Sequence, residues 1–266
     1  MKRCMIALTG MILCMAFLVP HASAQECRWY VRYNGKKQPH LPKEVTFSEC
    51  DDVYWIDRNH GDDCEEKVIY LTFDAGYENG NVEKILDTLK AENVHGAFFI
   101  LAHPVLKNTD LVKRMKEEGH LVCNHTKNHK NMTEVSAEEM KKNLTDLEKI
   151  YHEKTGYDLD KYFRFPEGEY NGDCLAVAKE LGYKTVFWSF GYADWDNAKQ
   201  PDPEKARKKI LENTHNGEVI LLHPTSETNA QILPELIRAW REAGFRFGTL
   251  DELCGNEQSQ PAPAGE

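Results

Sequence analysis

The 266-residue sequence predicts an α/β protein in which parallel strands form a distorted or incomplete (β/α) barrel. From Lys67 onward, short runs rich in branched and aromatic residues alternate with longer polar stretches of helical periodicity. Such alternation is typical of parallel strands that are covered by helices. At least six strand–helix units fit within about 190 residues, which favours a barrel over an open sheet.

Six apolar runs predict the strands. Each is short and dense in residues that favour a pleated, buried conformation, and none shows the strict alternation of a half-exposed strand. The runs are KVIYLTFD from Lys67, GAFFILA from Gly96, HLVCNH from His120, YFRFPEG from Tyr162, KTVFWSF from Lys184 and GEVILLH from Gly217.

Three intervening stretches predict amphipathic helices. NVEKILDTLKAEN, from Asn81, places four apolar residues on one helical face: Val82, Ile85, Leu86 and Leu89. A second helix begins with a capping box formed by Ser136 and Glu139. The third, ETNAQILPELIRAWREAG, starts at Glu227, and we expect a bend at Pro234.

The first 24 residues have the pattern of a secretory signal peptide. Lys2 and Arg3 precede a long apolar run, and the small residues ASA precede Gln25. We therefore expect a secreted or extracytoplasmic protein with no stable membrane insertion after cleavage. Without cleavage, the apolar run would serve as a membrane anchor.

The remaining chain divides into three predicted parts. Residues 25–66 lack the strand–helix alternation and form an N-terminal extension, residues 67–254 form the barrel domain, and residues 255–266 form a disordered Pro/Gly/Gln-rich tail. The formal net charge of -10 argues against a nucleic-acid partner, because phosphate binding requires a basic surface.

Six cysteines follow the predicted cleavage site. An exported chain can form disulfides, and a pairing among Cys27, Cys50 and Cys64 in the N-terminal segment is plausible. No CxxC spacing occurs, which disfavours a thiolate zinc site. Cys123 lies in an apolar run and is expected to be a buried free thiol.

Polar side chains follow the ends of the predicted strands, where barrel enzymes place their chemistry. Each alone has an ordinary explanation: a strand-end aspartate commonly caps a turn, and an isolated HxxxH binds a metal in only about one case in five. Their joint occurrence around one rim is harder to explain by chance. The residues are Asp74, His125, His129, Arg164, Asp194, Trp195 and His223.

The chemistry of these groups converges on hydrolysis. Two imidazoles four residues apart, His125 and His129, bind one divalent cation if their segment makes a helical turn. A nearby carboxylate takes a proton from activated water, and an arginine keeps that carboxylate ionised. A separate histidine protonates the leaving group. This inventory suits the hydrolysis of an amide or an ester.

Five ordered motifs, TFDAG, HTKNH, RFPEG, DW and ILLH, lie within the stretch from Lys67 to Leu253. The set resembles the polysaccharide deacetylase family, which is also described by its NodB homology domain and as carbohydrate esterase family 4. The resemblance implies a NodB-like incomplete barrel, a glycan substrate and a divalent metal, with zinc expected first and cobalt or manganese as alternatives.

The resemblance also implies a role for each site residue. Asp74 is the catalytic base held by Arg164, and His223 is the acid. The remaining implied roles are metal binding by His125 and His129, orientation of a catalytic partner by Asp194, oxyanion binding by the backbone N–H of Glu167, and an acetyl-methyl pocket walled by Trp195 and Leu221.

One departure from the family pattern points to a subfamily. Ala75 stands where typical members have a second aspartate that binds the metal, so the resemblance implies weaker metal binding, a different cation or an inactive site. TFDAGYENG and FWSFGYADWD are similar to the peptidoglycan N-acetylmuramic acid deacetylases, including the delta-lactam-biosynthetic enzymes.

The subfamily resemblance implies deacetylation of muramic acid that lacks its stem peptide, in cell-wall modification. The alternatives are a deacetylase of peptidoglycan N-acetylglucosamine, chitin oligosaccharides or xylan, a non-catalytic glycan-binding relative, and a structural cell-wall protein.

Overall fold

The computed structural model describes residues 26–42, 45, 47 and 52–255. The predicted signal peptide, Cys50 and the tail after Gly255 therefore lie outside the described residues. Within these ranges, no helix combines the length and the apolar character that a membrane crossing requires.

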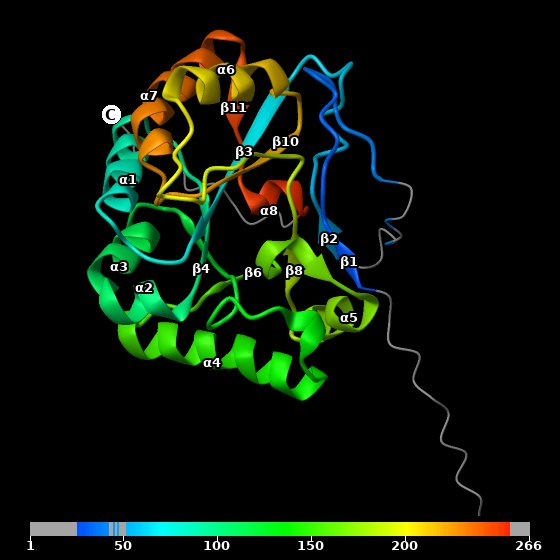
Figure 1. Ribbon diagram of the computed structural model, residues 1–266, viewed down its shortest axis with the longest axis vertical. Helices are drawn as coiled ribbons and strands as arrows, with labels where there is room; N and C mark the ends of the chain where they lie inside the picture. Colours follow the sequence, from blue (N-terminus) through cyan, green and yellow to red (C-terminus); the bar gives the residue numbers. More distant parts are fainter. Residues whose placement is uncertain (1–25, 43–44, 46, 48–51, 256–266) are drawn as a thin grey trace, which may run out of the picture.

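Nine strands form one sheet, in the order β2-β8-β6-β5-β4-β3-β10-β9, with β11 paired to β3. Every strand pair in it is parallel. The strands are β2 (Val53–Tyr54), β3 (Lys67–Ala75), β4 (Ala97–Ile100), β5 (Leu121–Asn124), β6 (Asp160–Phe163), β8 (Lys184–Val186), β9 (Phe190–Gly191), β10 (Glu218–Leu222) and β11 (Phe245–Phe247). All six predicted strands are present, and the sheet curls into the predicted incomplete barrel (Figure 1).

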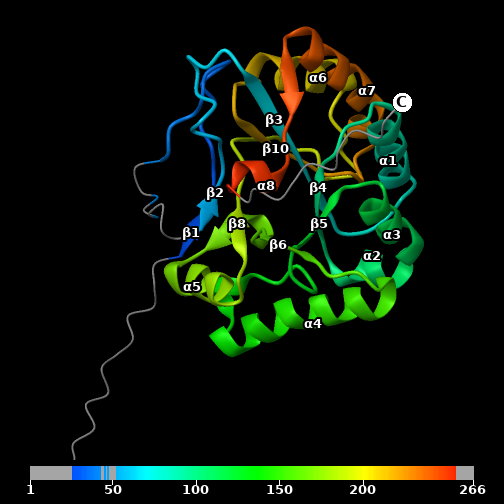
Figure 2. The ribbon, with the colours of Figure 1, turned by 180° about the vertical axis from the view of Figure 1, so that it is seen from behind.

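Most helices surround the outside of the curled sheet, whereas the short α8 (Leu250–Leu253) lies within the curl, as both views show (Figures 1 and 2). The other α-helices are α1 (Asn81–Ala91), α2 (Ala102–Lys107), α3 (Thr109–Glu117), α4 (Ala137–Thr155), α5 (Gly172–Glu180), α6 (Pro203–Asn213) and α7 (Glu227–Glu242). Two short 3₁₀ turns, η2 (Met132–Glu134) and η3 (Pro166–Gly168), complete the connections.

The side chains of strand β3 contribute to two hydrophobic clusters, one on each face of the sheet. Ile69, Leu71 and Phe73 pack with the helices outside the sheet, whereas Val68 and Tyr70 belong to a second cluster inside the curl. Successive side chains of a strand point to opposite faces, so one apolar run supplies both clusters.

The three predicted helices are confirmed. The predicted face of α1 is buried at Val82, Ile85, Leu86 and Leu89. The Ser136 side chain caps α4 by accepting from the N–H of Glu139, while the Glu139 carboxylate binds Lys130 at 2.7 Å. The α7 helix continues through Pro234.

The N-terminal extension packs onto the barrel. Its strand β1 (Cys27–Arg28) pairs with β7 (Glu169–Tyr170), and β2 extends the main sheet beside β8. The Trp29 and Trp55 side chains are 3% and 7% exposed and join an aromatic cluster. This segment therefore contributes to the core, although it lacks the strand–helix pattern that marks the rest.

Candidate active site

A cleft of about 700 Å³ opens beyond the carboxyl ends of the strands. The groups predicted from the strand ends meet there because parallel strands end at the same edge of the sheet. Of the predicted site residues, those that line the cleft are Asp74, His125, His129, Glu167, Trp195, Leu221 and His223.

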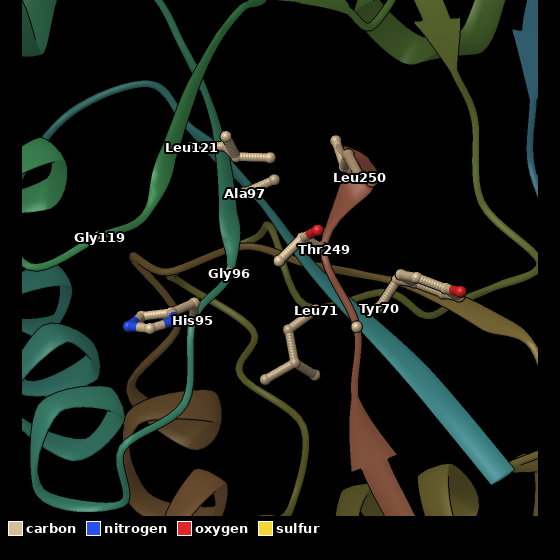
Figure 3. A pocket seen from close by; sticks show the side chains of 10 residues that line it. Tyr70, Leu71, His95, Gly96, Ala97, Gly119, Leu121, Thr249 and Leu250 are labelled. Atoms are coloured by element: carbon tan, nitrogen blue, oxygen red, sulfur yellow. The ribbon is translucent and has the colours of Figure 1, made fainter. Parts of the chain in front are cut away.

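A second, much smaller hollow lies at the opposite ends of the strands, around His95, Leu121 and Thr249 (Figure 3). Its volume is about 10 Å³, close to the smallest space that holds one water molecule. Leu250 of α8 forms part of its wall, so the short C-terminal helix lies across this end of the barrel. The large cleft is the better candidate for a glycan site.

Asp74 forms a buried ion pair with Arg164, whose Nη1 lies 2.8 Å from Asp74 Oδ1. The arginine side chain is fully buried and also donates to the Thr72 hydroxyl and to two backbone carbonyls, those of Val186 and Phe187. Burial alone would raise the pKa of Asp74, but the charge and hydrogen bond of Arg164, together with His125 and His223, outweigh burial and lower the pKa below its ordinary value. Asp74 is thus ionised at neutral pH and fixed in position.

The HTKNH segment turns without forming a helix, so the two histidines are brought together by another backbone conformation than the helical turn considered from their spacing. Thr126 and His129 have φ of 71° and 59°, and the Thr126 hydroxyl accepts from the His129 N–H. These left-handed residues bring the His125 and His129 rings to 5.0 Å between centroids. Strained backbone of this kind concentrates at functional sites, and Glu167, with φ of 56°, is another example in this cleft.

The imidazole of His125 is oriented by the backbone. Its Nδ1 lies 2.8 Å from the Arg164 carbonyl and must donate to it, which leaves the Nε2 lone pair directed at the cleft. Burial lowers the pKa of His125 to about 4, so the ring is neutral at pH 7. The Nε2 lies 3.5 Å from Asp74 Oδ2, and an acceptor facing a carboxylate needs a cation or a water proton between them.

The two imidazoles fit a divalent cation, but only as a partial ligand set. A backbone-oriented neutral histidine is the usual form of a metal ligand, and His129 lines the same cleft. Within the described ranges, however, no group of three or more His, Cys, Asp or Glu residues is placed to hold a metal. Any cation held by His125 and His129 would need ligands from water or substrate.

His223 is held by Asp194, with Nδ1 2.7 Å from Oδ1 and the His223 N–H donating to Oδ2 at 2.8 Å. Asn229 donates to the same carboxylate at 2.6 Å, and Asp194 is 1% exposed. Burial alone would lower the pKa of His223, but the charge and hydrogen bond of Asp194 raise it above its ordinary value. The cleft therefore contains an ionised carboxylate and a histidine biased toward its charged form.

The three residues predicted to contact substrate differ in exposure. Leu221 is 8% exposed and lies in the cleft wall, whereas Trp195 is 61% exposed beside the His223 ring, 6.2 Å between centroids. Trp195 therefore lines the cleft at its exposed rim. The Glu167 side chain faces Arg28 at 3.5 Å.

Ala75 does not line the cleft. The residue is 1% exposed and belongs to the apolar cluster outside the sheet, next to Asp74, which faces the opposite side. The missing carboxylate thus leaves an apolar side chain in an apolar environment.

One wall of the cleft was missed by the sequence reasoning. The residues that form it with the barrel are Arg28, Trp29, Tyr30, Val31, Tyr33, Trp188 and Lys209. The aromatic stretch RWYVRY was the available signal, because aromatic residues recur where sugars stack.

The incomplete parallel barrel, with a buried carboxylate–arginine pair and a histidine–aspartate pair in one cleft, defines a hydrolase of the acid–base type. Residues 61–186 match the polysaccharide deacetylase family. The chain is 38% identical to the peptidoglycan-N-acetylmuramic acid deacetylase PdaA of Bacillus subtilis over 189 residues, 71% of this chain and 72% of that protein. The chain belongs to this family, carbohydrate esterase family 4, whose enzymes cleave the amide of N-acetyl groups on sugars and are in general metal-dependent.

Two further comparisons also match this chain to deacetylases that act on peptidoglycan or belong to carbohydrate esterase family 4. The solved structure of B. subtilis PdaA, a family 4 carbohydrate esterase, matches with a TM-score of 0.81 at 32% identity, over 88% of this chain and 99% of that one. The peptidoglycan-N-acetylglucosamine deacetylase PgdA of Listeria monocytogenes is 35% identical over 72% of this chain, but only 40% of that protein is covered. The solved structure of PdaA confirms the predicted incomplete (β/α) barrel.

Proposed function

We propose that this protein removes the N-acetyl group from muramic acid residues of peptidoglycan strands that lack their stem peptide. The observation that carries the proposal is the pairing of an Arg164-held Asp74 with an Asp194-held His223 in one cleft. The similarity to PdaA supports muramic acid as the sugar. The enzyme acts outside the cytoplasm, on the cell wall, after residues 1–24 have been removed as a signal peptide.

Asp74 acts as the general base in the proposed reaction. Its carboxylate accepts a proton from a water molecule as the water oxygen attacks the acetamide carbon. The backbone N–H of Glu167 donates to the oxygen that becomes negatively charged. Arg164 keeps the carboxylate ionised and aligned until the proton is transferred.

His223 acts as the general acid. Its proton passes to the sugar nitrogen as the C–N bond breaks, which releases acetate and leaves a free amine. Asp194 supports the charged imidazole and fixes its ring. A divalent cation on His125 and His129, zinc first and cobalt or manganese next, would supply Lewis-acid polarisation. Leu221 and Trp195 contact the acetyl methyl and the sugar.

Two alternative functions rest on specific observations. The L. monocytogenes relative is named for N-acetylglucosamine, so the same machinery also suits that sugar. Loss of the second motif aspartate at Ala75 would suit a non-catalytic glycan-binding protein. The retained Asp74–Arg164 and His223–Asp194 pairs favour an active enzyme, because a binding protein has no need to keep either pair ionised.

The test offers three matched glycans to the purified protein: peptide-free peptidoglycan strands, peptide-bearing strands and a chitin oligosaccharide. Products are resolved by mass, and released acetate is measured. We expect loss of acetyl from muramic acid in peptide-free strands, with or without a further loss of water to a lactam. Deacetylation confined to glucosamine would overturn the muramic assignment, and release of no acetate from any glycan would favour the binding protein.

A further inference from the structure

The wall of the cleft formed by the N-terminal extension has no part in the acid–base chemistry. Five residues between positions 28 and 33 line it, and Lys209 of α6 lies on the same side. These residues share the cleft with Asp74 and His223, so a glycan placed for deacetylation would lie against them.

Lys209 is supported by an aromatic ring. Its ammonium lies over the ring of Tyr33, 5.4 Å from the centroid. Tyr33 is itself fixed, because its hydroxyl donates to the Gly191 carbonyl and its ring stacks on Phe190 at 5.1 Å. The Lys209 ammonium therefore rests on the Tyr33 ring, which is fixed by its contacts with Phe190 and Gly191 of β9; we call this ring the Tyr33 platform.

Lys209 also differs from Arg28, Arg207 and Lys208, which form ion pairs. Arg28, the second lysine or arginine in the cleft wall, lies 3.5 Å from Glu167 and 4.0 Å from Glu169. On α6, Arg207 pairs with Glu204 and Lys208 with Glu212. Within the described part of the chain, Lys209 has no carboxylate at ion-pair distance. It is thus a cation in the cleft of an acidic protein, available for an anion from the substrate.

We propose that Lys209, on its Tyr33 platform, binds a substrate carboxylate and selects muramic acid by its lactyl group. The inference rests on the proposed function and deepens it. The lactyl group ends in a charged carboxylate only when the stem peptide is gone, since the attached peptide converts it to a neutral amide. A lysine subsite thus accounts for a preference for peptide-free strands, and glucosamine, which has no lactyl group, gains nothing from it.

The experiment compares the variants Lys209→Gln, Lys209→Arg and Lys205→Gln. Lys205 is one turn earlier on α6 and faces a different surface hollow, which makes it a matched control. Steady-state kinetics use peptide-free strands and the same strands with the lactyl carboxyl reduced to an alcohol. Binding of both to the Asp74→Asn protein, whose turnover is expected to be much slower, is measured by calorimetry, so that affinity for the subsite is separated from the chemical step.

We expect Lys209→Gln to raise KM on peptide-free strands by about fivefold, the size of an exposed ion pair, with kcat nearly unchanged. On the reduced strands it should have no effect, while Lys209→Arg keeps most of the preference and Lys205→Gln matches the wild type. Added salt should weaken binding of the charged strands to the lysine form but not to the glutamine form.

Three outcomes would overturn the subsite. The first is equal affinity for the peptide-free strands and for the same strands with a reduced lactyl group. The second is an equal effect of Lys209→Gln on the binding of both kinds of strand. The third is that peptide-bearing strands, whose carboxylates lie in the peptide, bind as tightly as peptide-free strands and depend equally on Lys209. The proposed function fails differently, by an absence of acetate release from muramic acid in the wild-type protein. In that case, the calorimetric comparison of charged and reduced strands still shows whether Lys209 binds the lactyl carboxylate.

Discussion

Arg164 reaches across the sheet from the end of β6 to hold Asp74 at the end of β3, with Nη1 and Oδ1 2.8 Å apart and both side chains buried. The guanidinium packs over the Phe99 ring, 4.2 Å from its centroid. A carboxylate that is desolvated, paired and immobile in this way is suited to accept a proton and poorly suited to any role that needs movement.

Replacing Asp74 with Asn should reduce kcat by about 10²–10⁴-fold, because only basicity is lost from a nearly isosteric side chain. The amide oxygen can still accept from Arg164, so the loss of stability should be at most about 3 kcal/mol, the lower limit for breaking a buried ion pair. Acetate release and denaturant unfolding measure the two effects. Asp196→Asn, on the loop that follows Asp194, is the control. Near-normal turnover in Asp74→Asn would remove Asp74 as the base.

Replacing Asp194 with Asn should move the alkaline limb of the kcat profile to lower pH. Asp194 holds the pKa of His223 above its ordinary value, so the acid form survives to higher pH in the wild type and is lost earlier in the variant. Because the pKa of His223 is higher in the folded protein than in the unfolded chain, where it is near 6.5, the charged form of His223 stabilises the fold. This stabilisation is fully present at pH values below the unfolded pKa, and it is lost as pH rises through the folded pKa. A uniform fall in kcat without movement of the limb would indicate a purely structural role.

Removal of metal should abolish most activity, and added zinc, cobalt or manganese should restore it. Two imidazoles hold a cation less firmly than a full ligand set, so the metal should be easily removed by a chelator. His129→Ala should weaken the metal affinity measured by titration, whereas His103→Ala, an exposed histidine on α2, should not. Full activity in a protein verified to be metal-free would contradict the ligand assignment.

Replacing Ala75 with Asp should lower stability rather than strengthen the metal site. The side chain lies in the apolar cluster outside the sheet, where an unpaired carboxylate is costly. We expect a lower Tm and an unchanged metal affinity, with Ala75→Asn as the control for size without charge. An increase in metal affinity at unchanged Tm would show that the new carboxylate turns into the cleft.

Replacing Trp29 with Ala should destabilise the protein by about 3–5 kcal/mol, the usual effect of removing a buried tryptophan. Trp29 is 3% exposed, stacks on Phe187 at 4.8 Å and donates to the Trp188 carbonyl at 3.0 Å. Denaturant unfolding measures the change, and the exposed Arg32→Ala should alter stability by no more than about 0.5 kcal/mol. A small effect at Trp29 would mean that the barrel folds independently of its extension.

The sequence predicted the barrel strands and the residues at their carboxyl ends, because both depend on local pattern and on the rule that parallel strands end together. It did not predict the turn at His129, since isolated left-handed residues such as Thr126 and His129 leave no periodic signal. Nor did it predict which way Ala75 faces. The wall around Tyr33 was missed for another reason: its partners, such as Gly191, are distant in the chain, and residue types alone do not reveal such pairing.

The contact between Trp29 and Trp188 joins residues 159 positions apart, and it has a consequence for the order of events in folding. The extension is synthesised before its partners β7 and β8, so its aromatic side chains can pack against them only after these later strands have been made. Closing so long a loop is entropically slow compared with forming neighbouring strand pairs. Docking of the Trp29 segment is therefore expected to come late, as is the pairing of β3 with β10 and β11, and the cleft is complete only after both steps.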